Sequence, residues 1–165
     1  MFDREEEMDR YLDEIKDMLR RKQYAAVRDL LLPLEPPDIA MLLEESGEEF
    51  MPLLYRLLPK ELAAEGFVEL ESDSQEMLIN GFSNTELKEV LDELYLDDAV
   101  DIVEEMPASV VIRILDRATP EMRKSINEML QYPVDSAGSI MNVEYLSLKK
   151  DMTVADAFKR IRRIG

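Results

Sequence analysis

Helix-terminating residues recur at short intervals along most of this chain, and they limit how long any one helix can be. The pieces between them, of roughly 9–13 residues, are rich in Leu, Met, Ala, Glu and Lys, which favour helix. The separating residues are Pro33, Pro36, Pro37, Gly47, Pro59, Gly81, Pro107 and Pro120. We therefore predict an all-α fold built from many short helices.

Several of these helices carry start signals. Ser72-x-x-Gln75 and Ser83-x-x-Glu86 both have the spacing of a capping box. Pro52 falls inside an otherwise apolar stretch, which predicts either a kink or a helix that begins there.

Weak self-similarity runs through the helical region. The segment 38–45 resembles the segment 98–105, sixty positions later, and a longer amphipathic helix is expected over 3–22. Short helices of similar length with similar sequences favour a superhelical solenoid of short antiparallel helices. An irregular helical bundle with chance Leu-Glu similarity remains the alternative.

Composition excludes most catalytic chemistry. The chain has no His and no Cys, so it lacks an imidazole or thiolate nucleophile and the usual zinc ligands, and its 5 glycines form no phosphate-binding loop. We expect no enzyme activity. No apolar run is long enough to span a membrane, no secretory signal is visible, and the absence of Cys fits a cytosolic setting.

The charge is unevenly distributed. Residues 1–131 contain 33 acidic and 14 basic side chains, whereas residues 132–165 contain 4 and 6. An acidic block of this size repels nucleic acid and anionic lipid, so neither is expected as a partner, and it attracts cations. Solubility alone is the simpler explanation of the charge.

The pattern changes near residue 132. A strand-like run from Glu144 to Leu148 is followed by one amphipathic helix over 154–164, which Thr153-x-x-Asp156 opens as a capping box. One strand and one helix cannot bury their apolar sides alone. We predict an acidic helical domain over 1–131, followed by a linker and the beginning of a second, α/β module over 132–165.

Two segments carry a family resemblance. Residues 94–107 (LYLDDAVDIVEEMP) and 132–141 (YPVDSAGSIM) resemble MgtE-type magnesium transporters, although Leu96 stands where a proline often precedes the Asp pair. The resemblance implies an α-superhelical N domain followed by a partial, truncated CBS unit. It also implies Mg²⁺ as the ligand, bound at the interface between the N and CBS domains, holding the transporter's pore closed when Mg²⁺ is abundant.

The same resemblance implies the site and the partners. Its metal positions correspond to Glu65, Asp97 and Asp101, with Asp98 adjacent, while the CBS-side ligands would lie beyond Gly165. The partners would be the protein's own CBS domains and transmembrane pore, on the cytoplasmic side of the membrane. The whole transporter would be a homodimer through its CBS and membrane parts, which is compatible with a monomer for this piece alone.

The residues themselves agree with this assignment without requiring it. Asp97 and Asp101 are spaced i, i+4, so they share one helix face, and Mg²⁺ typically takes one or two carboxylates while keeping several waters. Asp97 and Asp98 are equally explained by favourable interactions at a helix N-terminus. Glu65 rests on the resemblance alone; its small neighbours at 63, 64 and 66 would admit a close-packed partner or simply another helix.

Two other functions stay open. A helical-repeat adaptor would bind a protein partner through its acidic surface without a metal. An adenine-nucleotide sensor is disfavoured, because only part of one CBS unit is expected and the acidic domain repels phosphate. The doublets 44–45, 48–49 and 104–105 are interpreted as solvated faces, and the 11 methionines as core filler.

Overall fold

A computed structural model describes residues 4–133, 136–139, 141 and 146–164, and this described part is all-helical, with no strand. Apart from α1, none of its helices is longer than 11 residues, which confirms the prediction of many short helices. In chain order they are α1 (Arg4–Arg20), α2 (Tyr24–Leu31), α3 (Pro36–Ser46), α4 (Met51–Leu57), α5 (Lys60–Val68), α6 (Ser72–Gly81), α7 (Asn84–Glu93), α8 (Leu96–Glu105), α9 (Ala108–Arg117), α10 (Pro120–Met129) and α11 (Val154–Ile164).

Local chemistry sets where several helices begin and end. Helix α4 begins at Met51 with Pro52 in its first turn, where the missing amide hydrogen costs nothing. Helix α7 begins with the predicted capping box: the Ser83 hydroxyl accepts from the Glu86 amide at 3.2 Å, and the Glu86 carboxylate accepts from the Ser83 amide at 2.7 Å. Helix α3 ends at Ser46 and is followed by Gly47, whose φ of 80° favours glycine.

The second predicted capping box, at Ser72, is wrong. Ser72 is the first residue of α6, after Glu71, and its hydroxyl donates to the Glu105 carboxylate of α8 instead. Gln75 is buried, and its side-chain amide donates to the Phe67 carbonyl at the end of α5, at 2.9 Å. Both side chains are used in tertiary contacts, which a local spacing rule does not detect.

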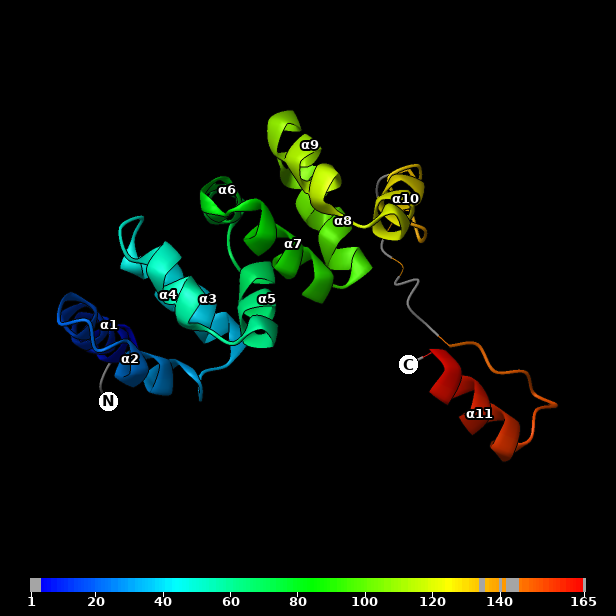
Figure 1. Cartoon of the computed structure of the whole chain (residues 1–165), viewed down its shortest axis with the longest axis horizontal. Coiled ribbons are helices and arrows are strands. Elements are labelled where there is room, and N and C mark those ends of the chain that lie inside the picture. Colours follow the sequence, from blue (N-terminus) through cyan, green and yellow to red (C-terminus); the bar gives the residue numbers. More distant parts are fainter. Residues whose placement is uncertain (1–3, 134–135, 140, 142–145, 165) are drawn as a thin grey trace.

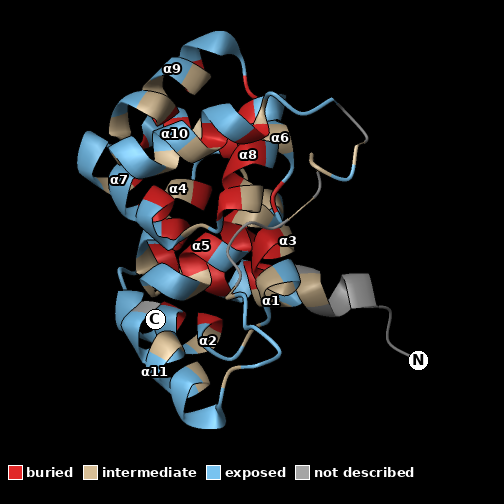
Figure 2. Cartoon of the chain, turned by 90° about the vertical axis from the view of Figure 1, so that its right-hand side faces the viewer, coloured by how far each residue is buried: buried red, intermediate tan, exposed pale blue. Residues whose placement is uncertain are grey.

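The helices pack in a regular order along the chain. Helix α1 packs against α3, α3 against α5, α5 against α7 and α7 against α9, and α8 packs against α10 in the same way. Figure 1 shows the chain progressing from α1 and α2 on one side of the molecule, through α3 to α7, to α8, α9 and α10 on the other. One continuous cluster of buried apolar side chains extends from Leu12 in α1 to Met129 in α10, and Figure 2 shows these buried residues along the interior.

The small residues of α5 serve a helix of the same chain. Ala63, Ala64 and Gly66 are all buried, and a Cβ atom added to Gly66 would lie only 2.9 Å from the Cγ2 atom of Ile39 in α3. Glycine at this position therefore lets α3 and α5 approach closely. These small residues were expected to admit either a close-packed partner or another helix, and the structure shows another helix of the same chain, α3, packed against Gly66.

The C-terminal part keeps its predicted helix. Helix α11 spans the expected residues, and the Thr153 hydroxyl accepts from the Asp156 amide at 3.2 Å. The expected strand is not confirmed: residues 146–148 are not in a strand, and Glu144 and Tyr145 lie outside the described residues. The apolar side of α11 is exposed, with Phe158 54% exposed, and Figure 2 shows the helix in the colour of exposed residues.

Candidate functional site: an acidic surface on α5 and α8

The sequence of α8 separates apolar from acidic side chains. Leu96, Ala99, Val100, Ile102 and Val103 are buried, so the acidic residues of the helix face outward. Asp97 and Asp98 are half-buried and Asp101 is exposed. Helix α5 follows the same rule, with Glu65 exposed beside buried neighbours.

A surface hollow of about 150 Å³ brings Glu65 and Asp98 together, although they are 33 positions apart in the chain. Its wall comes from α5, from the end of α7 and from the start of α8. Two further carboxylates, of Glu61 and Glu93, and the exposed ring of Tyr95 also line it.

A second hollow, of about 300 Å³, adjoins the first because Asp98 lines both. It contains Asp101 and Glu105 of α8, together with Glu69 and Glu71 from the segment between α5 and α6. We call the two hollows together the acidic surface. Eight different carboxylates line the acidic surface, and its described lining residues include no Lys or Arg.

The carboxylates of α8 oppose one another's ionisation. Asp97, Asp101 and Glu105 follow one another at intervals of four residues, which places them along one helix face. The pKa of Asp101 is raised above its usual value, first by burial and then by the negative charges of Asp97 and Glu105. A cation bound here would relieve this repulsion.

The first turn of α8 also supports the alternative interpretation of two predicted residues. Asp97 and Asp98 both lie in that turn, where a negative charge interacts favourably with the helix dipole. Tyr95 precedes the helix and makes no side-chain capping bond. Dipole stabilisation and cation binding are compatible for Asp98, which lines both hollows. Asp97 is less accessible to a cation, because one of its carboxylate oxygens is buried.

The four predicted metal residues do not all share one hollow. Asp98 lies with Glu65 in the first and with Asp101 in the second, whereas Asp97 lines neither and acts on the site through its charge. Among the residues that the structure describes, no group of three or more carboxylates is close enough to hold a metal ion by itself. The acidic surface can therefore supply part of a coordination shell, completed by water or by a second surface.

Sequence analysis missed several members of this surface. Glu105 was interpreted as part of a solvated doublet, yet it lines the second hollow and accepts a hydrogen bond from Ser72. Its spacing of four residues from Asp101 was a usable signal. Glu61 and Glu69 lie four residues before and after Glu65, so the same spacing signal was present for them. Glu71 had no such signal, because only the packing of distant segments brings it to the site.

No helix of the described residues combines the length and the apolar character that crossing a lipid bilayer requires.

Known proteins share both this sequence and this fold. The family model of the MgtE intracellular N domain matches residues 34–135. The "Magnesium transporter MgtE" of Thermus thermophilus is 30% identical over 153 residues, covering 90% of this chain and 34% of the relative. That of Bacillus subtilis is 24% identical over 145 residues, covering 88% of this chain and 32% of the relative. The chain thus spans about a third of the length of these curated relatives.

Solved structures agree. A crystal structure of the cytosolic domain of the Mg²⁺ channel MgtE in complex with ATP matches with a TM-score of 0.81 and 29% identity, over 93% of this chain and 63% of that one. The soluble part of a magnesium transporter matches with a TM-score of 0.77 and 24% identity, over 95% and 62% respectively, which supports the fold. Since the family model covers more than half of the residues, the chain belongs to the family of MgtE intracellular N domains.

Proposed function

We propose that this chain is the magnesium-sensing regulatory part of a MgtE-type magnesium transporter. The observation that carries the proposal is the acidic surface, whose two adjoining hollows are lined by eight carboxylates with no basic side chain among the described lining residues. Carboxylate oxygen is the ligand type that Mg²⁺ prefers. The relatives named as magnesium transporters make Mg²⁺ the expected cation.

In this proposal Glu65, Asp98 and Asp101 would hold hydrated Mg²⁺, and Asp97 would strengthen the local negative field. The acidic surface offers only part of a shell, so an opposing acidic surface would supply the remaining groups. When Mg²⁺ is scarce, the two surfaces would repel one another and separate. Separation would release the pore, and binding would keep it closed.

The proposed organisation of the chain follows from the same assignment. Residues 1–131 would form a superhelical solenoid, an interpretation supported by the packing of α1 against α3, α3 against α5, α5 against α7, α7 against α9, and α8 against α10. Residues 132–165 would be the linker and the beginning of a CBS domain, to which α11 would belong. We propose a place on the cytoplasmic side of the membrane, within a homodimeric transporter, with the CBS domains and the pore as partners.

Transport by the full-length protein in liposomes tests the proposal. With the normal sequence, Mg²⁺ flux should fall when Mg²⁺ on the cytosolic side is raised. The double variant Asp98→Asn/Asp101→Asn should keep its flux open at Mg²⁺ concentrations that close the normal protein. A matched control, Glu48→Gln/Glu49→Gln, removes the same charge from two exposed residues between α3 and α4 and should close normally. Equal closing by all three proteins would refute the proposal.

One observation favours a second candidate, a metal-independent protein-interaction adaptor. Tyr95 lines the first hollow and is 64% exposed, and exposed aromatic rings are common anchors of protein interfaces. Such a partner would carry basic side chains to match the acidic surface. If Tyr95→Ala abolished an interaction that the metal chelator EDTA leaves unchanged, the adaptor would be the better description.

A further inference from the structure

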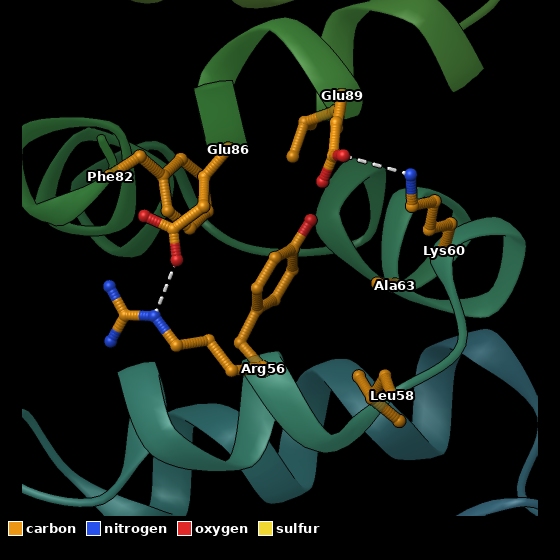
Figure 3. A pocket seen from close by; sticks show the side chains of 9 residues that line it. Arg56, Leu58, Lys60, Ala63, Phe82, Glu86 and Glu89 are labelled. Carbon is orange, nitrogen blue, oxygen red and sulfur yellow. Dashed lines mark hydrogen bonds and ion pairs between the residues drawn. The ribbon is translucent and has the colours of Figure 1, made fainter. Parts of the chain in front are cut away.

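A third cavity lies away from the acidic surface, between α4, α5 and α7. Its volume is about 380 Å³, within the usual range of small-molecule pockets. Figure 3 shows its lining, to which α5 contributes Lys60 and Ala63, whereas Glu61 and Glu65 of the same helix line the acidic surface. The two sites therefore use different faces of α5.

The inner wall of this cavity is apolar and aromatic. Leu58, Ala63, Phe82 and Val90 line it and are buried. The ring of Tyr55, which also lines it, packs against Phe82 with ring centroids 5.2 Å apart. These contacts hold the wall in place before any ligand arrives.

The Tyr55 hydroxyl lacks a hydrogen-bond partner among the described residues. Tyr55 is only 6% exposed, and its hydroxyl oxygen is buried. Burial raises the pKa of Tyr55, so the hydroxyl stays neutral and keeps its proton to donate. A buried hydroxyl without a partner carries a desolvation cost that an acceptor atom would offset.

Two ion pairs form the rim, and their charges balance. The Arg56 guanidinium lies 2.6 Å from the Glu86 carboxylate, and the Lys60 ammonium lies 2.9 Å from that of Glu89 (Figure 3). The Lys60 and Glu89 side chains are 60% and 47% exposed, so their pair is weak and can move aside. The paired rim gives no net preference for a charged ligand.

We propose that this cavity binds a small uncharged aromatic molecule that carries a hydrogen-bond acceptor, such as an aryl ketone or amide. Its ring would lie against Phe82 and Val90, and its acceptor would accept a hydrogen bond from the Tyr55 hydroxyl. Lys60 and Glu89 line the same cavity as Tyr55, and opening of their exposed ion pair would widen the entrance for such a molecule. This inference is independent of the acidic surface and of magnesium.

Fluorine NMR titration of the whole chain with two matched probes tests this site. The first, para-fluoroacetophenone, has a ring and a carbonyl acceptor. The second, para-fluoro-α-methylstyrene, carries a CH₂ group in place of the carbonyl oxygen, so it has nearly the same shape without the acceptor. We expect saturable binding of the ketone, about threefold to tenfold tighter than that of the hydrocarbon, the ratio that one hydrogen bond supplies. In Tyr55→Phe the ketone should lose this advantage, and the hydrocarbon should bind as before.

The comparison of probes on the unchanged chain does not depend on any variant folding. Equal binding of the two probes, or no saturable binding of either, would overturn the proposal. A thermal melt of Tyr55→Phe supplies a second readout: the variant should be at least as stable, because it removes a hydroxyl without a partner. Clear destabilisation without probe binding would indicate a bound water only, and would also overturn the proposal.

Discussion

Asp101 shows at the level of one residue how the acidic surface differs from an ordinary solvated helix face. Its pKa is raised by burial and by the charges of Asp97 and Glu105. The folded chain therefore disfavours the ionised form of Asp101, which is the form that a cation would bind. The cost is small, because solvent screens charges at an exposed position. A site that is mildly unfavourable when empty is suited to respond to the arrival of a cation.

Replacing Asp101 with Asn should therefore stabilise the chain at neutral pH. Like charges four residues apart on a helix cost a few tenths of a kcal/mol, which sets the expected gain at about 0.2–0.5 kcal/mol. Because the folded pKa is raised, the penalty grows as pH rises through it and is absent below the unfolded value of 3.8. Urea unfolding at neutral and acidic pH checks this, and a gain that persists in acid would contradict it.

The pKa of Glu86 is shifted in the opposite direction, downward. Hydrogen bonds from Arg56 and from the Ser83 amide lower its pKa to about 2, so its stabilising contribution is present above 4.5 and lost as pH falls toward about 2. Glu86→Ala should cost about 1–2 kcal/mol at neutral pH, because it removes both the cap and the ion pair. Glu86→Gln should cost less, since the amide still accepts the capping bond. Equal losses for the two variants in urea unfolding would argue against the cap.

At the level of elements, the close approach of α3 and α5 depends on Gly66. Gly66→Ala should destabilise the chain by about 1 kcal/mol, because the overpacking of Ile39 outweighs the better helix propensity of Ala. Gly81→Ala is the matched control, since a Cβ there meets no atom within 4 Å, and should be neutral or slightly stabilising. Denaturant midpoints of the two variants give the comparison. A stabilised Gly66→Ala would mean that the two helices can move apart freely.

Elements with local signals could be predicted from the sequence, and those set by tertiary contacts could not. The Ser83 capping box and the helix starting near Pro52 follow from neighbouring residues and are confirmed. Ser72 has the same spacing, yet the structure uses its hydroxyl for Glu105. Spacing rules predict hydrogen bonds between a side chain and the backbone of its own helix turn. They give no information about whether a residue of a distant helix will bond to that side chain.

In the candidate site, too, features set by local sequence could be predicted and those set by tertiary packing could not. Spacing placed Asp97 and Asp101 on one face of α8, and the mutual charge effect at Asp101 agrees. The meeting of Glu65 with Asp98 could not be derived from spacing, because it depends on how the segment that contains α6 and α7 places α5 and α8 relative to one another. Only the family resemblance pointed to Glu65.

For the whole molecule, the net charge of −17 implies a strong response to cations of any kind. Ionic screening alone would relax this repulsion uniformly, whereas a site would respond to Mg²⁺ at constant ionic strength. The two effects are separated by comparing variants of equal charge that differ only in where the charge is removed. The acidic surface and the 48–49 doublet provide such a pair.

The most direct measurement is small-angle X-ray scattering of the proposed cytosolic region at the length of the matched MgtE cytosolic domain, of which this chain covers 63%, with and without Mg²⁺ at constant ionic strength. We predict a smaller radius of gyration with Mg²⁺ for the normal sequence and for Glu48→Gln/Glu49→Gln. Asp98→Asn/Asp101→Asn should lose the contraction. A profile that Mg²⁺ leaves unchanged, or a contraction that survives in the Asp98/Asp101 variant, would contradict the assignment of the acidic surface as the sensor.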